Sequence, residues 1–155
     1  MRTTWTFHTA GQLLFGRDAV ARLGVEARRL RIARLLVCTD RVLLGAGIVE
    51  QVRRPLAEAG IAVEVFDGGE PEPSLDLVDA VVRQARPFQP DGVLGLGGGS
   101  NMDRANIAPV LLAHGGGPRD YMGEDKVPGP VLPLICVPTT SGTGSEVSAA
   151  SVLTD

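Results

Sequence analysis

Three apolar runs constrain the fold of this chain more than any other feature. Residues 33–40 read ARLLVCTD, residues 91–96 read DGVLGL, and residues 131–138 read VLPLICVP. Continuous apolar runs of this length are typical of strands buried on both faces of a parallel sheet. The alternating segment IAVEVFD at 61–67 indicates a fourth strand.

Segments with helical spacing separate these strands. Asp18 is expected to cap a helix that runs to about Leu30, residues 47–60 form a second helix, and Ser74 caps a third through about Arg86. A fourth helix is predicted over residues 101–112. The alternation predicts an α/β fold: an open, mainly parallel, Rossmann-like sheet with helices on both faces. The segments TTWTFHT and GQLLFG at the start of the sequence add a short N-terminal β-hairpin.

Composition narrows the class of protein. The 155 residues are 44% hydrophobic and carry a formal net charge of -3, with acidic and basic residues interspersed, so a nucleic-acid partner is not expected. No apolar stretch has the length of a signal peptide or a membrane span, so no membrane partner is expected either. Cys38 and Cys136 lie in apolar runs and are interpreted as buried, reduced thiols of a cytoplasmic protein.

The glycine-rich segment GLGGGS at 95–100 follows one of the buried strands. Glycines let the backbone approach a phosphate closely, and the helix that follows adds its positive N-terminal end. A strand–helix turn can need one glycine for structural reasons, but it does not need three. The segment departs from both the G-x-G-x-x-G fingerprint and the P-loop. It therefore predicts a phosphate or pyrophosphate site of a different kind.

Two further features lie at predicted strand ends. Asp40 could accept hydrogen bonds from the ribose hydroxyls of a dinucleotide and repel a 2′-phosphate, which favours NAD over NADP; alternatively it caps a helix or is an aspartate of a turn. The segment PTTSGTGSE at 138–146 offers hydroxyl and backbone donors to phosphate oxygens or a carboxamide, or it is a polar turn. Ligands of open α/β sheets bind beyond the carboxyl ends of the strands, where all three features fall.

Together these motifs resemble one family. The segments GGGSNMD at 97–103 and PLICVPTTSGTGSEV at 133–147 resemble the iron-containing (group III) alcohol dehydrogenases, which are related to dehydroquinate synthase and glycerol dehydrogenase. FDGGEPEPS at 66–74 and DYMGEDKVPGP at 120–130 match in the same order. The resemblance covers nearly the whole chain.

The resemblance implies a cofactor site for NAD. Asp40 matches a ribose contact, the glycine-rich segment matches the pyrophosphate loop, Asp103 matches an aspartate near the nicotinamide, and the hydroxyl segment completes the site. The implied cofactor residues are Asp40, Glu72, Gly98, Gly99, Ser100, Asp103, Thr139, Thr140, Thr143 and Ser148. Two positions depart from the family: Glu72 stands where Asn is frequent, and Asn106 stands where Lys is usual.

The resemblance also implies a two-domain enzyme. Residues 1–155 correspond to the dinucleotide-binding domain, while the C-terminal helical domain that would supply an aspartate and three histidines to iron or zinc is absent. His8 and His114 are the only histidines here and are expected to be surface or packing residues. No catalytic or metal-ligating residue is therefore assigned.

The expected function is the NAD-binding part of a metal-dependent alcohol dehydrogenase, acting on a small alcohol, aldehyde or ketone. The chain by itself is expected to bind the cofactor without turnover and to form a homodimer. A maleylacetate reductase, a hydroxyacid–oxoacid transhydrogenase or a non-catalytic nucleotide-binding module remain alternatives.

Overall fold

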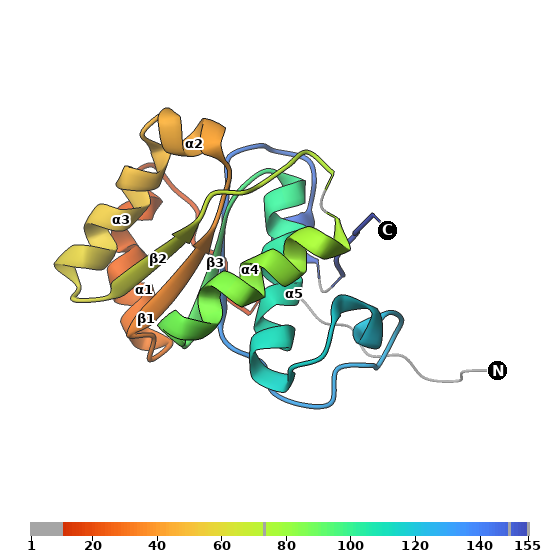
Figure 1. Cartoon of the computed structure of the whole chain (residues 1–155). Helices are drawn as coiled ribbons and strands as arrows, with labels where there is room; N and C mark the ends of the chain where they lie inside the picture. Colours follow the sequence, from red (N-terminus) through yellow and green to blue (C-terminus); the bar gives the residue numbers. More distant parts are fainter. Residues whose placement is uncertain (1–10, 73, 149, 155) are drawn as a thin grey trace, which may run out of the picture.

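A four-stranded parallel sheet forms the centre of the molecule. The structure is a computed structural model that describes residues 11–72, 74–148 and 150–154. Its strands are β1 (Arg34–Cys38), β2 (Ala62–Phe66), β3 (Gly92–Gly97) and β4 (Leu134–Pro138), in the order β2-β1-β3-β4. The first three strands are labelled in Figure 1. The chain thus builds outward from β1 to β2 and then returns to place β3 on the other side of β1.

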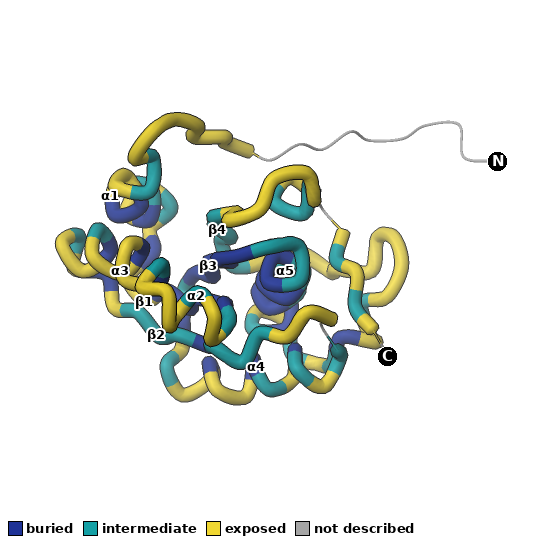
Figure 2. Tube along the Cα trace, turned by 90° about the horizontal axis from the view of Figure 1, so that it is seen from above, coloured by how far each residue is buried: buried dark blue, intermediate teal, exposed yellow. Residues whose placement is uncertain are grey.

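Helices cover both faces of this sheet. Seen from above, α1 (Leu23–Arg29) and α3 (Ile48–Glu58) lie on one side of the strands, and α4 (Leu75–Phe88) and α5 (Gly99–His114) lie on the other (Figure 2). The short α2 (Arg41–Gly45) follows β1. Three 3-10 turns complete the described elements, at Ala19–Arg22, Pro118–Tyr121 and Ser145–Val147.

The two faces of β1 bury alternate side chains. Leu35 and Val37 pack in the cluster that contains α1 and α3, whereas Leu36 and Cys38 pack in the cluster that contains α4 and α5. All four are fully buried, which explains why this strand reads as a continuous apolar run rather than an alternating one. The predicted α/β class, with a parallel sheet and helices on both faces, is confirmed.

The N-terminal predictions need correction. The first half of the predicted hairpin lies outside the described residues, and residues 11–16 form no regular strand. Leu13 and Phe15 are 73% and 96% exposed, so this segment gains no burial from the described part of the chain. Asp18 does not cap the following turn: its side chain makes no capping hydrogen bond, and its backbone has a positive φ of 59°, whereas capping residues usually have an extended backbone.

Other boundaries agree with expectation or extend it. Ser74 caps α4, since its hydroxyl accepts a hydrogen bond from the Leu77 N–H at 3.3 Å. The helix predicted over 101–112 begins earlier and ends later, as α5. The short α2 was not expected from the sequence.

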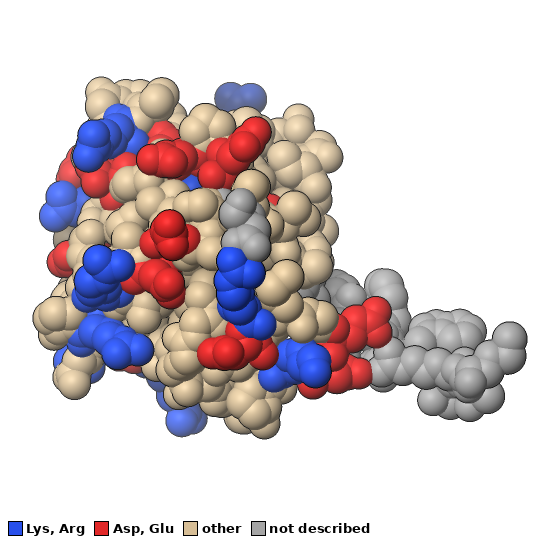
Figure 3. Space-filling view, turned by 45° about the vertical axis from the view of Figure 1, so that its right-hand side comes forward, with Lys and Arg blue, Asp and Glu red and all other residues tan. Residues whose placement is uncertain are grey.

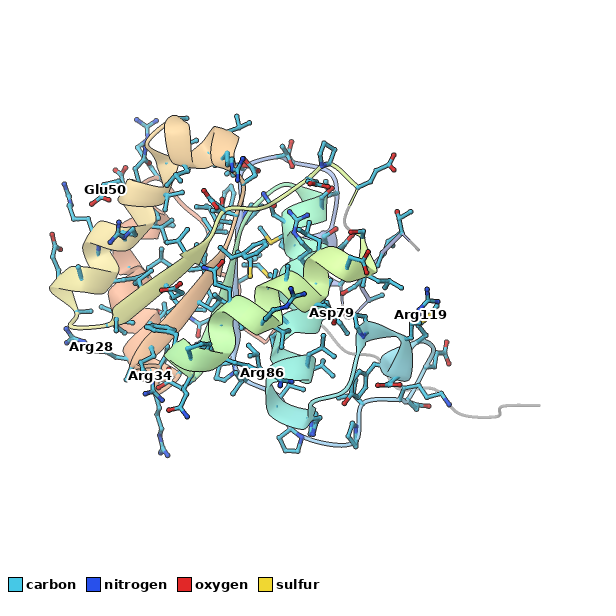
Figure 4. The ribbon with its side chains drawn as sticks, in the orientation of Figure 1. Arg28, Arg34, Glu50, Asp79, Arg86 and Arg119 are labelled. Carbon is cyan, nitrogen blue, oxygen red and sulfur yellow. The ribbon has the colours of Figure 1, made fainter. Side chains whose placement is uncertain are left out.

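The surface carries mixed charge. On the face in Figure 3, acidic and basic side chains are interspersed, and no large patch of one sign covers it. Arg28, Glu50 and Arg86, labelled in Figure 4, are exposed side chains on the outer faces of α1, α3 and α4. No helix in the described part of the chain is long and apolar enough to cross a membrane.

Close packing of α5 on β3 gives a stability prediction. A Cβ on Gly95 would lie 2.8 Å from the Ala105 Cβ and 3.0 Å from the Met102 sulfur, whereas a Cβ on Gly45 would meet nothing within 4 Å. We expect Gly95→Ala to lower the free energy of unfolding by about 1–3 kcal/mol, because α5 must shift. Gly45→Ala serves as the control and should change it by no more than about 1 kcal/mol. Urea unfolding measures both, and equal stabilities would contradict the packing described here.

Candidate functional site

A cleft opens where the strand order reverses. β1 and β3 are neighbours in the sheet, but the chain leaves them toward opposite sides, so their carboxyl ends diverge into a crevice. This crevice has a volume of about 540 Å³. Its walls are the loops after all four strands: Asp40, Arg41, Val42, Leu43, Asp67, Gly68, Gly69, Glu70, Pro71, Gly98, Gly99, Ser100, Asn101, Thr139 and Thr140.

The N-terminus of α5 forms one wall. Gly98 occupies the N-cap position, and no side chain caps this 16-residue helix. N–H groups in the first turn of a helix have no intrahelical acceptor, and the helix dipole adds partial positive charge there. This end of α5 therefore offers hydrogen-bond donors and positive potential to an anion in the cleft.

The three consecutive glycines have different structural reasons. Gly97 has a φ of +141°, and a Cβ there would collide with the Asn101 amide. A Cβ on Gly98 would lie 3.2 Å from the Thr140 hydroxyl, and one on Gly99 would lie 3.3 Å from the Ser145 hydroxyl. Because these positions carry no side chain, the segment after β4 can pack beside the start of α5, and the N-terminus of the helix stays open.

Asp40 caps α2 and also faces the cleft. Its Oδ1 accepts a hydrogen bond from the Leu43 N–H at 2.9 Å, and its Oδ2 accepts one from the Asn101 side-chain amide at 2.7 Å. The helix-cap interpretation is confirmed. It does not displace the ribose interpretation, because an ionised carboxylate has about four acceptor sites and two are used here.

The hydroxyl segment after β4 supplies the opposite wall. Thr139 and Thr140 are exposed and line the cleft, and the Thr139 N–H donates to the Gly97 carbonyl at 2.9 Å. This bond continues the β3–β4 pairing past the end of the strands. It holds the first residues of the segment beside the N-terminus of α5.

A second group of contacts fastens the rest of that segment to α5. Burial raises the pKa of the Asp103 carboxyl, while hydrogen bonds from the Val152 backbone and the Ser145 hydroxyl and the charge of Arg104 lower it. The Asn106 side-chain amide donates to the Ser145 and Ala150 carbonyls, at 3.4 Å each. Asp103 and Asn106 therefore hold Ser145, Ala150 and Val152 against the helix.

The cleft brings together six of the ten predicted cofactor residues: Asp40, Gly98, Gly99, Ser100, Thr139 and Thr140. The Ser100 hydroxyl donates to the Pro71 carbonyl and so joins the loops after β2 and β3. Glu72, Asp103, Thr143 and Ser148 do not line the cleft. Thr143 and Ser148 accept local hydrogen bonds from the N–H groups of Ser145 and Ala150.

Sequence reasoning missed the buried polar side chains beneath the cleft. Asn101 and Arg104 are 3% and 1% exposed, and they connect Asp40 to the Glu70 carbonyl. Burial lowers the pKa of Arg104, while the charges of Cys38, Asp40, Glu70 and Asp103 raise it. No local signal pointed to this network, because Asp103 precedes Arg104 and Asn106 follows it closely, so the arginine reads as an exposed residue of the helix.

The described residues do not fit a resident metal ion. No group of three or more His, Cys, Asp or Glu side chains within residues 11–72, 74–148 and 150–154 could hold one. His114 is exposed at the end of α5, and His8 lies outside the described residues. No metal chemistry is therefore assigned to this part of the chain.

Proteins of one known family resemble this chain in both sequence and fold. Residues 10–155 match the family of iron-containing alcohol dehydrogenases. The chain belongs to this family. It is 43% identical over 141 residues to long-chain-alcohol dehydrogenase 1 of Geobacillus thermodenitrificans, covering 89% of this chain and 36% of that protein. It is 34% identical over 142 residues to the NAD-dependent methanol dehydrogenase of Bacillus methanolicus, covering 92% and 37%.

Solved structures agree with these matches. An iron-containing alcohol dehydrogenase from Thermotoga maritima superposes with a TM-score of 0.87 at 35% identity, covering 98% of this chain and 42% of that one. A 1,3-propanediol oxidoreductase superposes with a TM-score of 0.89 at 32% identity, covering 94% and 38%. The chain thus spans well under half the length of the relatives it matches.

The two thiols give a prediction about reactivity. Burial raises the pKa of the Cys38 thiol to about 12, although the charge of Arg104 lowers it. Burial and the charge of Glu146 raise the pKa of the Cys136 thiol to about 11. At pH 8 the Cys38 thiol is therefore almost wholly protonated, and the thiolate is the reactive form. Iodoacetamide should leave Cys38 unmodified in the native chain and alkylate both thiols in urea, as mass spectrometry would show. Rapid native alkylation of Cys38 would contradict this burial.

Proposed function

We propose that this chain forms the NAD-binding part of an alcohol dehydrogenase. The observation that carries the proposal is the cleft at the strand-order switch point, where the uncapped N-terminus of α5 faces the carboxylate of Asp40. A dinucleotide has a pyrophosphate that suits the helix end and a ribose diol that suits the carboxylate. Membership of the family and the similarity to the NAD-dependent methanol dehydrogenase of Bacillus methanolicus support this choice.

Each wall of the cleft has a role in the proposed complex. N–H groups at Gly98 and Gly99 bind the pyrophosphate oxygens, and the Thr139 and Thr140 hydroxyls extend the donors toward the nicotinamide half. Asp40 accepts from the adenosine ribose and disfavours a 2′-phosphate, so NAD is preferred to NADP. Asp103 stays a predicted residue of the nicotinamide side, and Thr143 and Ser148 stay predicted residues of the hydroxyl segment that completes the site. Glu72, exposed beside Pro71, stays a predicted cofactor residue in the loop after β2.

The reaction proposed for the whole protein is oxidation of a small alcohol, or reduction of the matching aldehyde or ketone. A bound nicotinamide supplies the hydride acceptor or donor for it. This chain's residues bind and orient that cofactor. Because the described residues assemble no metal ligands, we propose that the 155-residue chain binds the nucleotide without turnover.

The residues of this chain do not specify the substrate. Relatives about 34% identical to the chain include the Bilophila wadsworthia sulfoacetaldehyde reductase and the Bacillus subtilis choline dehydrogenase. Similar N-terminal parts therefore occur in proteins whose names specify different substrates. A maleylacetate reductase or a hydroxyacid–oxoacid transhydrogenase with this fold remains an alternative for the same reason.

We also propose a cytoplasmic homodimer. The two free thiols suit a reducing compartment, although only Cys38 is buried as expected and Cys136 is half-buried. Leu13, Leu14 and Phe15 expose contiguous apolar surface, which a second copy would cover. Light scattering at high concentration should give twice the monomer mass, and a monomer at every concentration would contradict the dimer.

Nucleotide titration tests the binding site. We expect saturable NADH binding by calorimetry or nucleotide fluorescence, with weaker binding of NADPH. Gly98→Val should weaken NADH binding by more than about tenfold, because its side chain fills the space before the helix end. Gly98 has φ −85° and ψ −170°, an extended conformation that valine also adopts, so the fold should survive.

Gly129→Val is the matched control. A Cβ on Gly129 has no neighbour nearer than 3.8 Å, from His114, and this residue is outside the cleft. The Gly129→Val variant should bind NADH with the same affinity as the original chain. A folded chain that binds neither nucleotide, or that binds NADH equally well with Gly98→Val, would overturn the proposed function.

A further inference from the structure

A buried arginine lies beneath the cleft without a salt bridge. Arg104 is 1% exposed, and no ion pair of this side chain occurs among the described residues. Its Nη1 donates to the Glu70 carbonyl at 3.0 Å, and its Nη2 donates to the Asn101 side-chain oxygen. Burying a charge is costly unless it is paired and hydrogen-bonded, so an arginine in this place calls for a reason.

Asn101 connects this charge to the cleft. Its side chain lies where the loops after β1, β2 and β3 meet: Nδ2 donates to Asp40 at 2.7 Å, and Oδ1 would lie 2.6 Å from a Cβ on Gly69. A Cβ on Gly97 would collide with the same amide. The amide therefore fills a space that two glycines leave for it, and it has little freedom to move.

The chemistry of the three groups fixes the direction of every hydrogen bond. A guanidinium only donates, so the Asn101 oxygen must face Arg104. The amide nitrogen then faces Asp40, and because that nitrogen only donates, Asp40 must accept. Arg104 thus determines the orientation of the amide, and the amide in turn holds the carboxylate as an acceptor.

The carboxylate of Asp40 is consequently fixed at both oxygens. The Leu43 N–H at the start of α2 holds Oδ1, and Asn101 holds Oδ2. Two acceptor sites are left for a diol. A carboxylate held at both oxygens cannot rotate away from a 2′-phosphate to reduce the repulsion. A carboxylate with a hydrogen bond to only one oxygen could do so.

We propose that Asn101 and Arg104 are positioning residues that set nucleotide selectivity by immobilising Asp40 toward the ribose. The proposal rests on the proposed function, since it concerns how the same cleft distinguishes a free 2′-hydroxyl from a 2′-phosphate. Neither side chain needs to touch the nucleotide, because both act through the Asp40 carboxylate.

Charge-conserving variants test this most cleanly. Replacing Arg104 by an uncharged residue would also remove a positive charge beneath the site, and that loss would itself weaken binding of the more anionic NADPH. Asn101→Ala removes the amide at constant charge. Arg104→Lys keeps the charge but loses the planar fork that orients the amide. If one variant fails to fold, the other retains the test.

The readout is the ratio of the NADPH and NADH dissociation constants of the 155-residue chain, from calorimetry. We expect Asn101→Ala and Arg104→Lys each to lower this ratio by about tenfold, as for the loss of one charge-assisted hydrogen bond. Gln84→Ala is the control, since its amide joins α4 to Glu64 and the Val65 carbonyl in β2, away from Asp40. The control should leave the ratio unchanged.

A double-variant cycle shows whether the effect passes through Asp40. Asp40→Ser removes the carboxylate but keeps a good cap for α2. Asn101→Ala should leave the ratio unchanged in the Asp40→Ser background, because nothing remains to position. An equal loss of both affinities, or an equal change of ratio in both backgrounds, would overturn the proposal while leaving the proposed function standing. If the folded original chain binds neither nucleotide, both fail.

Discussion

The close contact between α5 and β3 is the constraint on which the site depends. Gly95 lets the helix approach the strand until Ala105 and Met102 lie against it. Since β3 is fully buried and its neighbours are β1 and β4, the start of α5 is placed at the carboxyl end of the sheet centre. The helix dipole and the first-turn N–H groups therefore face the crevice without any specialised loop to aim them.

That same contact brings a polar network into the interior. Once α5 lies this close, its first turns come within reach of Asp40 after β1 and of Glu70 after β2. Asn101 and Arg104 then join loops that are distant in sequence, and Ser100 adds the Pro71 carbonyl. Three strand ends are held together by side chains of a single helix. A ligand that binds across them meets a site whose parts are already in place.

The sequence predicted those parts of the fold that depend on local pattern. Apolar runs predicted three strands and an alternating segment predicted the fourth, and Ser74 predicted the start of α4, because burial and capping leave periodic or positional signals. Asp18 does not cap the turn that follows it, so that prediction was wrong. The sequence did not predict α2, because a helix of five residues shows too little periodicity. Asp40 was predicted both as a cap and as a ribose contact; the structure confirms the cap, and its place in the cleft supports the other.

The network beneath the cleft could not be predicted in this way. Asn101 and Asp40 are separated by 61 positions, and Arg104 and Glu70 by 34. Each side chain reads as an ordinary polar residue of a helix or loop until the strand order is known. Only the order β2-β1-β3 brings the loops after these strands together around the first turns of α5.

Glu72 and Asn106, the two departures from the family pattern, affect the cleft in different ways. Glu72 is exposed and does not line the cleft, although its neighbour Pro71 does, so solvent and salt screen its charge in part. Asn106 lacks the positive charge of a lysine, but its amide donates to two carbonyls of the segment after β4. The helix end and the buried Arg104 still supply positive potential near the cleft. The substitution at Asn106 thus changes how that segment is held more than whether an anion is attracted.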